Sequence, residues 1–216
     1  MTLRSTSVGC LAEIIEALGA PVAEFAPLLV PVLVAATKDA ETEVSSNAAY
    51  AMGVLGEASG AGIAPHIPAL LQALSANCIA VQRDSSSTLD NACGAVARLI
   101  LAAPANVPLA TVAPRLFASL PLQTDFAENH VIYRCIEALA KHHFAIVAPA
   151  FPHILASFCA AAGAEEPQIE AETAALMAGL CKWLSQQPQS AAAFGAAVAA
   201  LNATQKAVMQ RACPGI

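Results

Sequence analysis

Ala26-Pro27-Leu28-Leu29-Val30-Pro31 is a phrase that the chain repeats, and its recurrence decides the expected fold. Each Ala-Pro pair precedes an aliphatic segment, a polar break and a second segment rich in Ala, Leu and Val. The other copies are Ala64-Pro65-His66-Ile67-Pro68, Ala113-Pro114-Arg115-Leu116-Phe117 and Ala148-Pro149-Ala150-Phe151-Pro152. Proline suits a first helical turn because its φ is fixed and the missing N–H has no partner there. A period of about 35 to 50 residues indicates HEAT-type helical repeats.

We therefore predict an all-α fold, a HEAT-repeat α-solenoid in the form of a right-handed superhelical arc of about five antiparallel helix pairs. Residues 1–216 are expected to form this single arc. Its first hairpin is incomplete, because residues 4–18 have the pattern of a second helix without a first. The complete pairs are expected at 22–37 with 42–58, 63–77 with 86–103, 109–120 with 127–142, 145–162 with 168–187, and 191–200 with 203–212.

The second helices of the pairs align without gaps at steps of 40, 44 and 40 residues, starting from Ser7–Ile15. One helical face is apolar and should form the core. Its members are Val44, Ala48, Ala51, Met52, Leu55, Ala92, Ala95, Val96, Leu99, Ile132, Cys135, Ile136 and Leu139. The opposite edge is polar and predicts a binding surface on the concave side of the arc. This edge carries Glu43, Asn47, Tyr50, Glu57, Asp90, Asn91, Arg98, Glu128, Tyr133, Arg134 and Glu137.

Two features of this surface have alternative interpretations. Asn47 and Asn91 occupy the same rung of successive helices, where they could be solvated or could hydrogen-bond the backbone of an extended ligand, since an amide both donates and accepts. Trp183 is the single tryptophan. It could fill the core or stand exposed as an anchor for a bound peptide.

Composition limits the function classes. Hydrophobic residues make up 57% of the chain and charged residues 12%, and the formal net charge is −6, which argues against a nucleic-acid surface. No membrane span is expected, since the longest apolar stretches, Ala26–Ala36 and Ala191–Leu201, are shorter than the ~18 residues required. The opening Met1–Arg4 has no apolar signal region. The seven cysteines lack a C-x-x-C pair, which favours buried, reduced thiols in an intracellular protein.

The sequence gives no support for catalysis, a metal site or a cofactor. The five histidines form no His-Glu pair at metal spacing, and His142 and His143 point about 100° apart on a helix. The glycines of Gly56–Gly62 follow no strand and precede no G-K-[ST], so they are not a phosphate loop. We expect no enzyme activity.

The stretch Glu43-Val44-Ser45-Ser46-Asn47-Ala48-Ala49-Tyr50-Ala51-Met52-Gly53-Val54-Leu55-Gly56-Glu57 resembles the importin-β (karyopherin-β) family near its C-terminus. The resemblance continues through Asp90-Asn91-Ala92-Cys93-Gly94-Ala95-Val96-Ala97-Arg98-Leu99 and Leu120-Pro121-Leu122-Gln123-Thr124-Asp125. With Arg4–Gly19 it covers about two-thirds of the chain. It implies a C-terminal fragment of a longer importin.

The family resemblance also implies a function: nuclear import of basic cargo by a receptor that shuttles between cytoplasm and nucleus. The expected cargo is core histones or ribosomal proteins, with histone tails first and a histone chaperone as a possible companion. Ran-GTP is expected to bind only N-terminal repeats absent from this sequence. The chain is expected to be a monomer. The alternative is a HEAT-repeat scaffold subunit without a transport role, which would bind through its turns rather than through an acidic groove.

Overall fold

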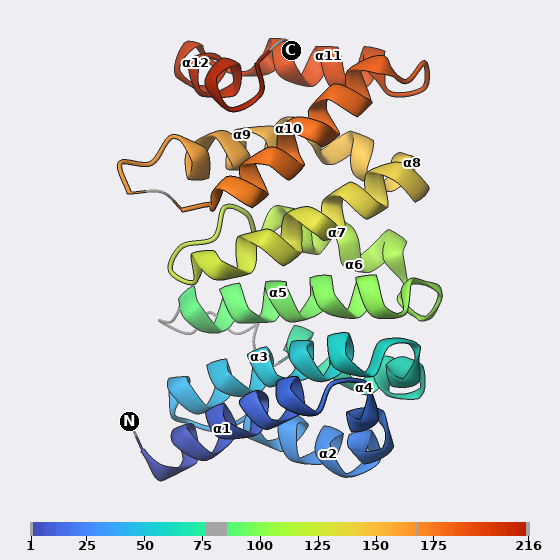
Figure 1. Ribbon diagram of the computed structural model, residues 1–216, viewed down its shortest axis with the longest axis vertical. Coiled ribbons are helices and arrows are strands. Elements are labelled where there is room, and N and C mark those ends of the chain that lie inside the picture. The colour runs from blue at the N-terminus through green and yellow to red at the C-terminus, as the bar shows by residue number, and fades with distance from the viewer. Residues whose placement is uncertain (1, 77–85, 167, 215–216) are drawn as a thin grey trace. The chain divides into compact units, whose positions relative to one another are not determined.

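The computed structural model describes residues 2–76, 86–166 and 168–214, and every regular element in these ranges is helical (Figure 1). The predicted all-α class is therefore confirmed. Cys78 and the last residue of the expected helix 63–77 lie outside the described residues. The chain divides into two compact units. Unit 1 comprises Met1–Leu109 and Gln123–Glu128, and unit 2 comprises Ala110–Leu122 and Asn129–Ile216. The continuous arc over 1–216 stays a prediction.

In unit 1 the second helices of successive hairpins pack on one another, α1 on α3 and α3 on α5 (Figure 1). The first helices α2 and α4 lie behind them, and α2 contacts both α3 and α4. This is the neighbour-to-neighbour packing expected of HEAT repeats. The elements are α1 (Leu3–Leu18), η1 (Ala20–Phe25), α2 (Ala26–Ala36), α3 (Thr42–Ser59), η2 (Gly60–His66), α4 (Ile67–Leu74), α5 (Ser86–Ala102), η4 (Pro104–Asn106) and η5 (Phe126–Glu128), where η marks a 3₁₀ helix.

Unit 2 follows the same plan. Helix α7 packs on α10, and α9 packs on α11 and α12. Polar links join α7 to the segment that carries α10: Asn129 Nδ2 donates to the Gln168 carbonyl at 2.9 Å, and His130 Nδ1 lies 3.0 Å from Thr173 Oγ1. The elements are α6 (Leu109–Ala118), α7 (Asn129–His142), α8 (Phe144–Val147), η6 (Ala148–Ala150), α9 (Phe151–Ala162), α10 (Ala171–Gln186), α11 (Ala191–Ala200) and α12 (Ala203–Ala212).

The predicted core face is confirmed, since all thirteen of its residues are at most 4% exposed. The Ala-Pro proline starts an α-helix only in the first phrase, where Pro27 stands in the first turn of α2. In two other phrases Pro65 and Pro149 lie in the 3₁₀ segments η2 and η6, and the second prolines, Pro68 and Pro152, stand in the first turns of α4 and α9. The fourth prediction is wrong, because α6 begins at Leu109 and carries Pro114 in its interior.

Residues Phe144–Ala162 form a longer apolar helical run than the sequence analysis expected. Their length of 19 residues and mean hydropathy of 1.8 are sufficient for a membrane span. The run is composed of α8, η6 and α9, and 44% of its most apolar window is buried inside the protein. Phe151, Ile154 and Phe158 are among the buried side chains. This burial is what a core helix of a packed helical protein requires, and the length criterion alone does not distinguish the two cases.

Small residues set the distance between α3 and α5. A Cβ placed on Gly53 would lie 2.7 Å from Ala95 Cα, and one on Gly56 would lie 2.5 Å from Leu99 Cδ2. Ser46 and Ser87 share a hydrogen bond of 3.0 Å across the same contact. Helix α3 is buried on nearly all sides as a result, from Val44 to Ser59. At Gly60, which ends α3 with φ of 53°, the chain needs a conformation that glycine adopts without strain.

We predict that Gly53→Ala destabilises the protein by about 1–3 kcal/mol, because the added methyl group meets the backbone of α5 and forces the helices apart. Gly179→Ala is the matched control. Gly179 also lies inside a helix, but a Cβ placed there would meet nothing within 4 Å. Alanine at this position should therefore stabilise the protein by about 1 kcal/mol. Urea denaturation followed by circular dichroism measures both. Equal midpoints for the two variants would contradict the tight α3–α5 contact.

Candidate functional site

Arg98 of α5 is the centre of a charged network in unit 1. Its Nε donates to Glu57 Oε2 at 3.0 Å, its Nη2 donates to Glu128 Oε1 at 3.1 Å, and its Nη1 donates to the other oxygen of Glu128. The guanidinium also lies over the ring of Tyr50, 5.4 Å from the centroid, at cation–π distance. The network therefore joins α3, α5 and the segment Gln123–Glu128 through one side chain.

Burial makes this network more than a surface ion pair. The side chain of Arg98 is 12% exposed and that of Glu128 is 3% exposed, while that of Glu57 is 50% exposed. A two-pronged contact between guanidinium and carboxylate satisfies both partners, which a buried pair needs. Gly94 makes the approach possible, since a Cβ there would overlap the Glu128 carboxylate. The glycine of the sequence Asp90–Ala95 is therefore required for the packing of Glu128 against α5.

The pKa shifts follow from burial and pairing. Burial raises the pKa of Glu128, although Arg98 opposes the shift. Burial is the largest single influence on Arg98 and lowers its pKa. The hydrogen bond to Glu128 and the negative charges of Glu128 and Glu57 together outweigh it, so the pKa is raised and the guanidinium stays charged. Burial also raises the pKa of Tyr50, and the positive charge of Arg98 only partly offsets this. Tyr50 therefore presents a neutral phenol beside the network.

A pocket of about 290 Å³ opens beside Tyr50 and Arg98. Its walls come from α1, α3 and α5 and from the residue that ends α1: Glu16, Gly19, Tyr50, Val54, Glu57, Ala58 and Arg98. Arg98 in this wall pairs with both Glu57 and Glu128, so its positive charge is neutralised. Glu16 and Glu57, both exposed, supply acceptors that a bound ammonium or guanidinium group can reach. We call this cavity the Glu16–Glu57 pocket.

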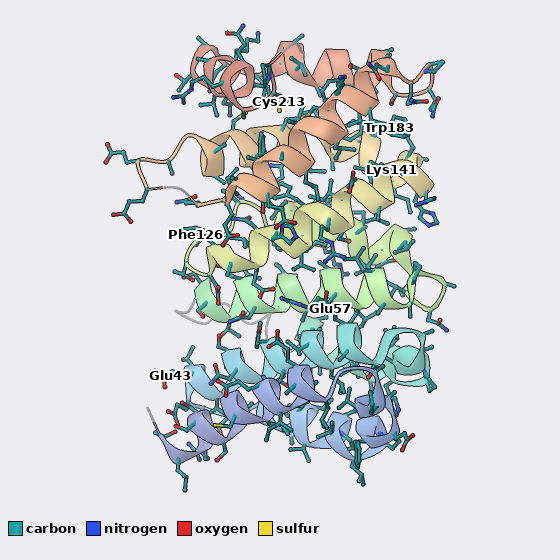
Figure 2. All side chains as sticks on the ribbon, viewed as in Figure 1. Glu43, Glu57, Phe126, Lys141, Trp183 and Cys213 are labelled. Carbon is teal, nitrogen blue, oxygen red and sulfur yellow. The ribbon has the colours of Figure 1, made fainter. Side chains whose placement is uncertain are left out.

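The sequence analysis missed Glu16. The step of 40 residues between α1 and α3 could have found it, because that step places Glu16 level with Gly56, next to Glu57. Glu43 stands at the other end of α3 (Figure 2). It is exposed and accepts a hydrogen bond of 3.1 Å from Ser5 Oγ. Glu43 and Glu57 are exposed on α3 and Tyr50 is half-buried, while Glu57 also accepts the hydrogen bond from Arg98.

Asp90 does not belong to an exposed surface, contrary to the sequence prediction. It is 1% exposed. Its Oδ2 accepts backbone N–H bonds from Gln123, Thr124 and Asp125 at 3.0, 2.7 and 2.9 Å, and the Thr124 hydroxyl at 3.1 Å. A carboxylate that receives three successive backbone donors holds a loop in place. Asp90 therefore positions the segment that presents Glu128 to Arg98.

The predicted role of Asn47 and Asn91 as exposed binding residues is also corrected. Asn91 is 6% exposed and its Nδ2 donates to Ser46 Oγ at 3.0 Å. Asn47, which is half-buried, donates from Nδ2 to the Ser5 carbonyl at 3.0 Å. The two amides link α1 to α3 and α3 to α5. Asn91 is too deeply buried to hold a ligand backbone.

In unit 2 the expected site residues differ in their exposure to solvent. Tyr133 is 1% exposed and packs edge-on against Phe158 with ring centroids 5.8 Å apart, so its assignment to the binding surface is wrong. Glu137 is half-buried, and its Oε1 accepts a hydrogen bond of 2.8 Å from Lys141 Nζ of the same helix. Trp183 is half-buried, between the two alternatives that the sequence left open (Figure 2). Glu128 belongs with the corrected residues, since Arg98 and the packing at Gly94 bury it.

Comparison with known proteins finds similarity to importins. Human importin-4 is 40% identical over 136 residues, which are 63% of this chain and 12% of that protein. The chain is a homologue of importin-4. A probable importin subunit beta-4 of Schizosaccharomyces pombe is 32% identical over 159 residues, 70% of this chain and 15% of that protein, and mouse importin-4 is 38% identical over 125 residues. No family model matches the chain.

The importin-β resemblance seen in the sequence is therefore confirmed. The chain spans between 11% and 15% of the length of these importins.

We predict that Asp90→Ala destabilises the protein by about 2–4 kcal/mol, because the N–H groups of the Gln123–Asp125 segment lose their common acceptor. Asp90→Asn keeps one carbonyl oxygen and should cost less. The exposed Glu24→Ala serves as control, with a change within about 0.5 kcal/mol. Urea denaturation measures all three. An Asp90→Ala midpoint equal to that of Glu24→Ala would contradict the role given to Asp90.

Proposed function

We propose that the chain is the cargo-binding part of a nuclear import receptor and that a basic, extended protein segment binds along the exposed second-helix face of unit 1. The similarity to proteins named importin supports a transport receptor, not an enzyme. The receptor would shuttle between cytoplasm and nucleus. The cargo would be a core histone, bound through its lysine- and arginine-rich tail, or a ribosomal protein.

The Glu16–Glu57 pocket is the observation that carries the proposal. It combines two exposed carboxylates with a neutral aromatic ring, and its cation, Arg98, is paired with both Glu57 and Glu128. A lysine or arginine side chain gains Coulomb attraction from the carboxylates and can lay its apolar stem against Tyr50 and Val54. Glu43 extends the negative surface toward the start of α3. The net charge of −6 favours the encounter with a basic partner.

The binding mode differs from the asparagine ladder expected from the sequence. Since Asp90, Asn91, Glu128 and Tyr133 are buried, the cargo would contact carboxylates and the Tyr50 ring instead of amide rungs. Glu137 and Trp183 of unit 2 remain proposed contacts. Each exposed ion pair contributes roughly 0.2–1 kcal/mol, so the affinity must come from several contacts and fall as salt rises. Ran-GTP binding is not assigned to this chain, which we propose to be monomeric.

Fluorescence anisotropy with a labelled histone-tail peptide tests the proposal. Glu16→Gln with Glu57→Gln removes two negative charges from the pocket and should weaken binding about 2- to 30-fold, the effect of losing two exposed ion pairs. Glu165→Gln with Glu166→Gln is the matched control. It removes the same charge from two exposed carboxylates of unit 2 outside the pocket and should leave the affinity nearly unchanged.

Three outcomes of this experiment distinguish binding in the pocket from attraction by net charge and from a scaffold role. Loss of binding in the pocket variant alone supports the proposed site. Equal weakening in both variants would show that net charge, and not the pocket, attracts the peptide. No binding to the parent chain at low salt would reject the basic-cargo function and favour a scaffold role.

A further inference from the structure

One arginine in the wall of the Glu16–Glu57 pocket pairs with two carboxylates, and these differ in what solvent can reach. Arg98 donates to Glu57 Oε2 at 3.0 Å and to Glu128 Oε1 at 3.1 Å. The side chain of Glu57 is 50% exposed, whereas that of Glu128 is 3% exposed. A guanidinium carries a single positive charge, so the three side chains together keep one negative charge. Burial determines that a ligand meets this charge at Glu57.

The fold places Glu128 on Arg98 without placing it in the pocket. Glu128 is not among the residues that line the cavity. Gly94 leaves room for its carboxylate, since a Cβ at that position would overlap it. Asp90 holds the preceding loop by accepting the N–H groups of Gln123–Asp125. Both oxygens of Glu128 accept from the guanidinium, which is the strong, two-pronged form of this pairing. A buried carboxylate therefore balances the cation of the pocket wall.

The charge of the pocket depends on this balance. Glu16 and Glu57 are its exposed carboxylates, and Arg98 is its cation. With Glu128 present, the four side chains carry a formal charge of two negative units, equal to that of Glu16 and Glu57 alone. Without the charge of Glu128, Arg98 would cancel one of the two exposed carboxylates. The pocket would then keep only half of its attraction for a cation.

We propose that Glu128 determines the specificity of the Glu16–Glu57 pocket for a basic segment, although it does not contact that segment. The inference rests on the proposed cargo-binding function of the pocket. Glu128 is a positioning residue that acts through Arg98: it holds the guanidinium and supplies the buried charge that balances it. The exposed carboxylates are thereby left to attract the cargo.

Fluorescence anisotropy with the labelled histone-tail peptide measures the effect. Glu128→Gln keeps the size of the side chain and removes its charge. We expect it to weaken binding roughly 5- to 30-fold, the effect of one unbalanced charge several ångströms from a bound cation. Glu24→Gln is the matched control. It removes the same charge from an exposed side chain of η1 outside the pocket and should change the affinity by less than about 2-fold.

A double variant separates the effect of charge from structural damage. Glu128→Gln with Arg98→Gln removes the cation as well, so the pocket regains its original charge. The affinity should return to within about 3-fold of that of the parent chain. A merely structural role of Glu128 predicts no such recovery, because the loss of the second partner cannot repair the fold. Urea denaturation of each variant verifies that the protein used for binding is folded.

Glu57→Gln provides a measurement that does not require the Glu128→Gln protein to fold. If Glu128 balances Arg98, Glu57 attracts the peptide equally in the parent chain and in the double variant. Glu57→Gln should then weaken binding by the same factor in both backgrounds. If Arg98 instead cancels Glu57 in the parent chain, Glu57→Gln weakens binding only in the double variant.

Three results would overturn the inference alone. Glu128→Gln could bind like Glu24→Gln, the removal of Arg98 could fail to restore binding, or Glu57→Gln could act only where Arg98 is absent. A parent chain that does not bind the peptide at all rejects the cargo-binding function and this inference with it. The two failures are therefore distinguishable.

Discussion

The close contact between α3 and α5 is the constraint on which the rest of unit 1 depends. Gly53 and Gly56 leave no side chain between the two helices, so Ala95 and Leu99 can approach the α3 backbone. This distance brings Glu57 of α3 within 3.0 Å of Arg98 of α5 and places Tyr50 under the guanidinium. A wider spacing would separate these groups, and Arg98 would then lose two of the partners that offset its burial.

The second helices carry their polar residues for two different purposes. Asp90, Asn91 and Glu128 face inward, where they position the Gln123–Glu128 segment and link neighbouring helices. Glu16, Glu43 and Glu57 face solvent and form the negative surface. Buried carboxylates need donors within hydrogen-bond distance: Arg98 supplies them to Glu128, and the Gln123–Asp125 loop supplies them to Oδ2 of Asp90, so the polar edge is in large part an internal scaffold. The exposed remainder is what a partner can contact.

The two units differ in the chemistry that they leave available. Unit 1 presents carboxylates around a pocket, and its described thiols are Cys93, buried in α5, and Cys10, exposed on α1. The cysteines of unit 2, Cys135, Cys159, Cys181 and Cys213, are buried. Charge suits a reversible contact with a basic segment, and the proposed import function rests on this feature.

The sequence by itself determined the helical class, the hairpin boundaries to within a few residues and the core. Periodicity of Val44, Met52 and Leu55 suffices for this, because a helix must turn its apolar side to its neighbours. Only the tertiary structure decided which polar residues are exposed. Asp90 and Glu57 look alike in the sequence, but the Gln123–Asp125 loop covers the first, whereas the second stays half exposed beside Arg98. Burial by segments distant in the chain has no local signature in the sequence.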